Sequence, residues 1–122
     1  MQMKVVDRHA DLAKPIANLL AWFYLTLAIF TEVAATTSMK LSDGFTHLQP
    51  SLLILPFYVL SLAFLTLSLK KLEIGFAYAI WSALGTLLIF MIGICFFHEP
   101  VTVLKTISVL FIIIGVIGLK QA

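Results

Sequence analysis

Residues 19–39, LLAWFYLTLAIFTEVAATTSM, form an apolar run in which Glu32 is the only charged side chain. A helix of about 20 apolar residues crosses the ~30 Å hydrocarbon core of a bilayer, so this run predicts a membrane-spanning helix. A charge at mid-bilayer is costly, and such residues usually mark ion pathways or proton relays. Glu32 is therefore the first candidate for a proton- and substrate-binding group. The alternative is a carboxylate that only forms hydrogen bonds between helices.

Three further apolar runs follow, over residues 52–69, 74–97 and 103–119. With 61% hydrophobic residues, 11% charged residues and a mean hydropathy of +1.09, the chain is too apolar for a soluble domain of 122 residues. The runs lack the alternating polarity of barrel strands. We expect an all-α membrane protein, with a bundle of four transmembrane helices over residues 19–122 and a polar N-terminal extension over residues 1–18.

The segments between these runs leave little room for other functions. They are too short for a catalytic domain outside the membrane, and they carry no nucleophile triad or phosphate-binding loop, so we expect no enzyme and no cofactor. A net charge of +2 does not indicate nucleic-acid binding. The single cysteine and three scattered histidines do not have the spacing of a metal site.

Residues three or four apart share a helix face, which places Ala28, Ala35 and Thr36 beside Glu32. The two alanines are expected to leave space next to the carboxylate. The Thr36 hydroxyl has two possible acceptors, the Glu32 carboxylate and the backbone of its own helix. The sequence does not distinguish between them.

Aromatic residues in the second and third runs are candidates for contact with a cation. Tyr78 and Trp81 are three apart and face the same way, and Tyr58 shares a face with Ser61. Rings beside a carboxylate can hold an organic cation through charge and cation–π attraction. The alternative is a belt of aromatic residues at the membrane interface, but Trp81 lies deep in its run.

The fourth run contains Ser108 and Gly115, seven residues apart and hence on one helix face. Small residues let helix backbones approach closely in membranes. The spacing indicates helix packing, either within one bundle or across a dimer.

Three stretches resemble signatures of the small multidrug resistance family: TEVAATTSMKLSDGFTHLQPS (31–51), AYAIWSALG (77–85) and VLFIIIGVIGLK (109–120). The resemblance covers about residues 28–120. It implies an antiparallel dimer that exchanges protons for cationic solutes, with Glu32 as the shared carboxylate. It also implies a hinge at Gly85 and a dimer contact at Ser108 and Gly115. The substrate chamber it implies is lined by Tyr58, Tyr78, Trp81, Ala28, Thr36 and Ser61.

The sequence departs from the family pattern at two places. Ala83 replaces the first glycine of the usual Gly-x-Gly at the hinge, which stiffens it. Ala35 stands where the guanidinium-exporting branch has tryptophan, which favours the branch that exports quaternary ammonium and aromatic cations. Guanidinium or polyamine export, lipid-linked sugar flipping and a non-transporting assembly subunit remain alternatives. The resemblance also implies a multi-pass protein of the cell inner (plasma) membrane, in contact with lipid.

The distribution of basic residues bears on orientation. Two lie on one side of the predicted spans, Lys40 and Lys105. Six lie on the other side: Lys4, Arg8, Lys14, Lys70, Lys71 and Lys120. The bias favours cytoplasmic N- and C-termini, and without the N-terminal extension it falls to three against two. The partner in the dimer is either a second copy of this chain or a paired homologue.

Overall fold

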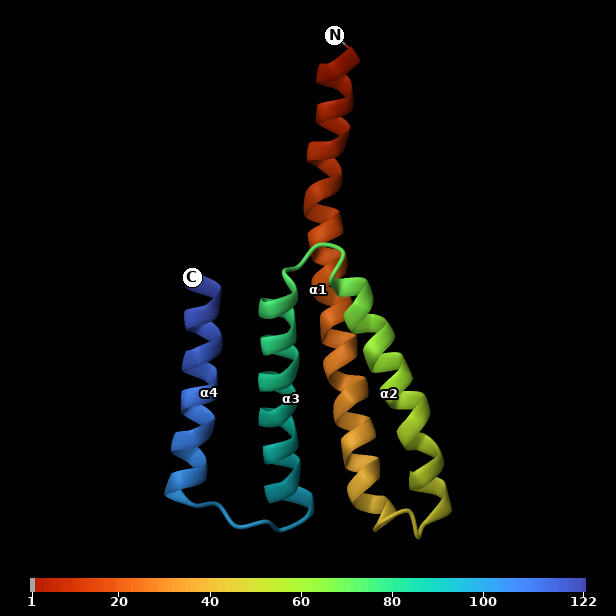
Figure 1. Cartoon of the computed structure of the whole chain (residues 1–122), viewed down its shortest axis with the longest axis vertical. Coiled ribbons are helices and arrows are strands. Elements are labelled where there is room, and N and C mark those ends of the chain that lie inside the picture. Colours follow the sequence, from red (N-terminus) through yellow and green to blue (C-terminus); the bar gives the residue numbers. More distant parts are fainter. Residues whose placement is uncertain (1) are drawn as a thin grey trace.

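The computed structural model describes the backbone of residues 2–122 and the side chains of residues 15–122. It consists of four helices that run alternately up and down: α1 (Gln2–Ser42), α2 (Leu48–Ser68), α3 (Ile74–Phe96) and α4 (Val103–Gln121) (Figure 1). All four contain a segment long and apolar enough to cross a membrane. The predicted four-helix membrane bundle is confirmed. The expectation for residues 1–18 falls mostly on side chains outside the described residues and stays a prediction.

Helix α2 begins at Leu48, four residues before the predicted start. Pro50 therefore lies in its first turn, where a missing amide proton costs nothing because these amides have no partner within the helix. The polar residues that precede the apolar run thus belong to the helix.

The core lies between α1 and α2. Leu25, Ala28, Ile29 and Val33 of α1 form a buried cluster with Leu65 of α2. Helix α3 packs against both α1 and α2, whereas α4 contacts only α3 among the described helices. The buried residues are thus concentrated on α1, which also carries Glu32.

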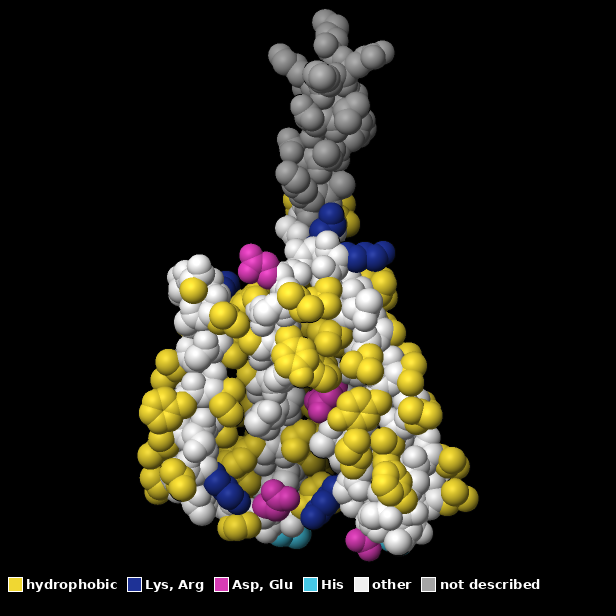
Figure 2. All heavy atoms as spheres, viewed as in Figure 1, with side chains coloured by type: hydrophobic (Ala, Val, Ile, Leu, Met, Phe, Trp, Pro, Cys, Tyr) yellow, Lys and Arg dark blue, Asp and Glu magenta, His cyan; other side chains and the backbone are white. Residues whose placement is uncertain are grey.

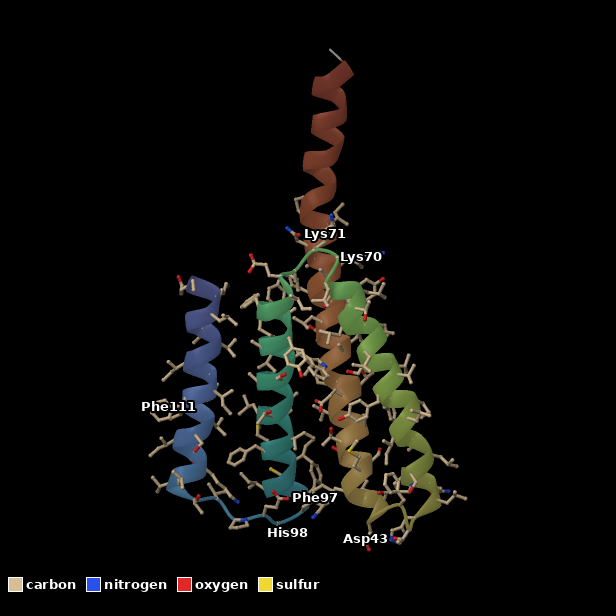
Figure 3. The ribbon with its side chains drawn as sticks, in the orientation of Figure 1. Asp43, Lys70, Lys71, Phe97, His98 and Phe111 are labelled. Atoms are coloured by element: carbon tan, nitrogen blue, oxygen red, sulfur yellow. The ribbon has the colours of Figure 1, made fainter. Side chains whose placement is uncertain are left out.

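Charged groups gather at the two ends of the bundle, and hydrophobic side chains cover its flanks, apart from one acidic group at mid-height (Figure 2). The end that holds Lys70 and Lys71 lies opposite the end that holds Asp43 and His98 (Figure 3). The apolar flanks are suited to contact with the hydrocarbon core of a bilayer.

Candidate cation and proton site

The Glu32 side chain is half-buried where α1 faces α3. Its Oε1 accepts a hydrogen bond of 2.8 Å from the Thr36 hydroxyl one turn along the helix. Of the two acceptors that the sequence allowed for the Thr36 hydroxyl, the structure thus shows the Glu32 carboxylate and not the backbone of its own helix. Its Oε2 is buried and has no hydrogen-bond partner among residues 15–122. One carboxylate oxygen is thus anchored and the other has unused acceptor capacity.

Gly85 of α3 makes room for this carboxylate. A Cβ atom at Gly85 would lie 2.6 Å from Glu32 Oε2, which is closer than such atoms approach in proteins. The sequence-based interpretation of Gly85 was a hinge, and that role stays a prediction. Its position in the structure shows a separate reason for glycine, because any side chain would displace the carboxylate.

A pocket of about 300 Å³ opens between α1 and α3 at Glu32. Its lining consists of Glu32, Thr36, Trp81, Ser82, Gly85, Thr86 and Ile89. The lining combines one carboxylate, an indole ring and three hydroxyl groups. Charge, an aromatic face and hydroxyl oxygens are groups that bind organic cations.

Trp81 is held in place by a hydrogen-bond network that joins three helices. Its indole Nε1 donates to Ser61 Oγ of α2 at 3.1 Å and to the Ala28 carbonyl of α1 at 3.3 Å. Ser61 Oγ in turn donates to the same carbonyl at 2.7 Å. Polar groups in an apolar interior are stable only when paired, so this network fixes the indole at the pocket wall.

Tyr78 packs beside Trp81. Its ring centroid lies 5.4 Å from that of Trp81, with the rings tilted by 46°. The prediction that both rings face the same way is confirmed. Tyr78 is 56% exposed and does not line the Glu32 pocket, so its role in substrate binding stays a prediction.

The structure separates the predicted chamber residues into groups. Thr36 and Trp81 line the pocket with Glu32, whereas Ala28 and Ser61 are completely buried behind it. Tyr58 is half-buried on α2 and does not line this pocket. Their roles in substrate binding stay predictions.

The space expected beside Ala28 and Ala35 is filled. Both alanines have no exposed surface. Ser61 of α2 reaches the Ala28 carbonyl, so the small side chain lets α2 approach α1 rather than leaving a cavity there. The open space at Glu32 lies on the α3 side instead.

Ser82, Thr86 and Ile89 were not singled out from the sequence. With Gly85 they follow the i, i+3, i+4, i+7 pattern of one helix face. That pattern was a usable signal, since two hydroxyl residues and a glycine on one face of an apolar helix are unusual.

Helix α4 contributes nothing to this pocket. Ser108 and Gly115 are exposed, and no residue of α4 is buried. Phe111, on the same helix face as these two, points away from α3 (Figure 3). This face is free in the protomer, so the structure does not use it for packing within the bundle.

Among the side chains that the structure describes, no three His, Cys, Asp or Glu residues lie together in the manner of a metal site.

Comparison with known proteins finds relatives that match most of the chain. Residues 20–117 match the family described as Small Multidrug Resistance protein. An uncharacterized membrane protein, YvaE, of Bacillus subtilis is 55% identical over 81% of this chain and 83% of its own. The multidrug resistance protein mmr of Mycobacterium leprae is 43% identical over 84% and 97%. The quaternary ammonium compound-resistance protein QacF of Klebsiella aerogenes is 39% identical over 78% and 86%.

A family match over most of the chain and four membrane-spanning helices lead to one assignment. The chain is a multi-pass membrane protein that belongs to the Small Multidrug Resistance family, whose members are transporters and not enzymes.

Proposed function

We propose that this protein exports aromatic or quaternary ammonium cations in exchange for protons, and that Glu32 binds both. The observation that carries the proposal is the Glu32 carboxylate, which meets a pocket of about 300 Å³ walled by Trp81 and has a buried Oε2 without a partner among residues 15–122. Relatives named for multidrug resistance and quaternary ammonium compound resistance support the substrate class.

Exchange follows from competition for one group. A carboxylate that holds a proton is neutral and loses its attraction for a cation, and a bound cation in turn disfavours protonation. Cation and proton therefore occupy the site in turn. If the pocket opens to one membrane face at a time, protons replace each cation on the face where it leaves, and they are released on the other face when the next cation binds.

The proposed working unit is an antiparallel dimer, with one Glu32 from each protomer. Support comes from α4, whose Ser108 and Gly115 lie on an exposed face that makes no contact within the protomer. A pocket that is open in one protomer is then closed by the other. The partner is a second copy of this chain or a paired homologue.

Glu32→Gln tests the proposal, because the amide keeps the shape of the side chain and removes the charge and the proton exchange. In proteoliposomes with an imposed pH gradient, we expect the variant to lose gradient-driven accumulation of benzyltrimethylammonium. In detergent solution, we expect it to lose cation-induced proton release. Glu73→Gln is the matched control, since Glu73 is an exposed acid outside the spans. Accumulation by Glu32→Gln against a gradient would disprove the mechanism.

The same proton-release measurement distinguishes the substrate classes. We expect a response to aromatic and quaternary cations and a weaker one to guanidinium. A response to guanidinium alone would instead indicate that the protein belongs with the guanidinium exporters. No response to any cation would favour a non-transporting membrane subunit.

A further inference from the structure

A second pocket continues the Glu32 pocket toward the end of the bundle. It has a volume of about 200 Å³, and it shares Thr36 and Ile89 with the first pocket. Its other lining residues are Thr37, Lys40, Ile92, Gly93, Phe97 and Glu99. Shared walls make the two pockets one groove between α1 and α3, which runs from Glu32 to the level of the α3–α4 connection.

The groove has polar groups along its length. Thr37 Oγ1 is buried and has no hydrogen-bond partner among residues 15–122, and the same holds for Glu32 Oε2 higher in the groove. The exposed side chains of Lys40 and Glu99 add charged groups at the far end of the groove. The groove is thus suited to carry polar species to Glu32.

Glu99 is held at the mouth of this groove by the backbone. His98 adopts a left-handed conformation with φ of 56°, which is uncommon for a residue other than glycine. This turn brings the Glu99 amide back to donate a 3.0 Å hydrogen bond to the Gly93 carbonyl. Phe97 donates to the same carbonyl at 3.2 Å. The chain after α3 is therefore folded back onto the helix.

The Glu99 side chain lies on Gly93. A Cβ atom at Gly93 would be 2.5 Å from Glu99 Oε2 and 2.9 Å from Cδ, so only glycine allows the carboxylate to rest there. The arrangement repeats that of Glu32 on Gly85, two turns earlier on α3. Two carboxylates thus pack on two glycines of the same helix, one at mid-membrane and one at the mouth.

Lys40 lines the mouth together with Glu99. The other lysine at this end, Lys105, donates through Nζ to the Pro100 carbonyl at 2.9 Å and is engaged by the α3–α4 connection. An acidic group flanked by basic groups is visible at this end of the bundle (Figure 2). The positive charge of Lys40 at the mouth therefore weakens the attraction of Glu99 for an entering cation.

We propose that Glu99 is an entry site for cations in the dimer protomer whose Lys40 end faces the cytoplasm: it attracts the cationic substrate to the mouth of the groove and passes it to Glu32, while Lys40 opposes entry. The inference rests on the proposed function. In this proposal, Glu99 raises the rate at which the cation arrives, and Glu32 carries out the proton exchange. A charge at the rim of a site changes association and its salt dependence, which gives the proposal a specific signature.

The test is the association rate of benzyltrimethylammonium with the reconstituted protein, followed by the fluorescence of Trp81 in the pocket. A Trp22→Phe background leaves Trp81 as the only tryptophan, since the chain has two. At low salt we expect Glu99→Gln to slow association about threefold to fivefold, and Lys40→Gln to speed it by a similar factor. At about 1 M salt, where charges are screened beyond ~3 Å, both differences should vanish.

Asp43→Asn is the matched control. Asp43 is exposed at the same end of the bundle but does not line the groove, so its removal should leave the rate unchanged. Equal rates for Glu99→Gln and the unmodified protein at low salt, or equal slowing by Asp43→Asn, would overturn the inference. Gly93→Ala is a second variant, which keeps the charge and moves the carboxylate out of the mouth. It should also slow association, and an unchanged rate would count against the proposal.

The outcomes separate this inference from the proposed function. Normal cation-induced proton release with no effect of Glu99→Gln on the rate would overturn only the entry site. A protein that shows neither proton release nor a fluorescence response to cations would overturn both.

Discussion

At the residue scale, the site depends on the close contact between the Glu32 side chain and a glycine on the facing helix. Glu32 reaches from α1 to the surface of α3, and Gly85 allows the approach. Thr36 fixes one oxygen from the same helix. The carboxylate is thus placed by Thr36 of α1 and Gly85 of α3, with one oxygen left without a hydrogen-bond partner among residues 15–122.

Gly85→Ala tests this match. The added methyl would lie 2.6 Å from Glu32 Oε2, so the carboxylate must move. Forcing a side chain away from its preferred rotamer costs about 0.5–1.5 kcal/mol, which corresponds to weaker cation binding by roughly twofold to twelvefold. The helix preference for alanine over glycine, about 0.5–1 kcal/mol, offsets this cost, so the thermal unfolding temperature should change little. Equilibrium titration with benzyltrimethylammonium and thermal unfolding measure the two effects.

Gly75→Ala is the control for that prediction. Gly75 is also in α3, and a methyl there would meet nothing within 4 Å. The Kd of the Gly75→Ala variant for benzyltrimethylammonium should match that of the unmodified protein. If Gly85 acts only as a hinge, Gly85→Ala should slow transport and leave the Kd unchanged, and that result would show that Gly85 is not needed to make room for the Glu32 carboxylate.

The sequence predicted those parts of the site that follow from the period of a single helix. Thr36 was placed beside Glu32 by its spacing of four, and Tyr78 beside Trp81 by a spacing of three. The network of Ser61, Ala28 and Trp81 was out of reach, because it depends on how three helices approach one another. For the same reason, the space beside Ala28 was expected to be open and is filled by α2.

At the element scale, hydropathy was sufficient to predict all four helices, since lipid leaves a spanning chain almost no alternative to a helix. The predicted start of α2 is wrong because hydropathy marks only the apolar run, whereas the helix also includes the polar residues before it. The position of Glu99 was also beyond prediction. It depends on the left-handed turn at His98, and histidine carries no signal for that conformation as strong as that of glycine.

Helix α4 differs from the other three in having one neighbour and no buried residue. Its half-buried residues are Lys105, Val109, Ile113 and Val116. These follow helical spacing and indicate the face toward α3, so Ser108 and Gly115 lie on a different face. A helix that packs weakly in its own protomer is the element best placed to pack against another chain.

Gly115→Leu tests whether this face joins two protomers. A methyl at Gly115 would meet nothing within 4 Å, so the larger side chain should leave the protomer folded. Close packing across a dimer would be blocked, and an overpacking cost of about 1–3 kcal/mol should lower the dimerisation constant by roughly fivefold to 150-fold. Cross-linking in proteoliposomes and mass photometry in nanodiscs measure the population.

Leu110→Phe is the control for α4, since Leu110 is 52% exposed and lies on a face away from Ser108 and Gly115 and to one side of the face toward α3. It adds bulk toward lipid and should leave the dimer intact. A dimer that tolerates Gly115→Leu as well as Leu110→Phe would show that α4 is not the contact.

At the scale of the whole molecule, the up-and-down path places Lys70 and Lys71 at one end of the bundle and Asp43 and His98 at the other (Figure 3). Within residues 15–122 the two ends carry nearly balanced positive charge, three lysines against two. Insertion follows the excess of Lys and Arg on the cytoplasmic side, so this part of the chain has only a weak preference. The three basic residues before Pro15 supply most of the bias.

Neutralising these residues with Lys4→Gln, Arg8→Gln and Lys14→Gln tests which dimer the protein forms. The count falls from six against two to three against two, and we expect a C-terminal reporter to shift from mainly cytoplasmic to both faces. Replacing Lys40 and Lys105 instead should strengthen the original orientation, which makes that variant the matched control. If the neutralised protein alone accumulates cations better than the unmodified chain, the N-terminal charges restrict assembly with itself and point to a paired homologue. Equal activity, with the unmodified reporter already on both faces, would show that one chain supplies both Glu32 carboxylates.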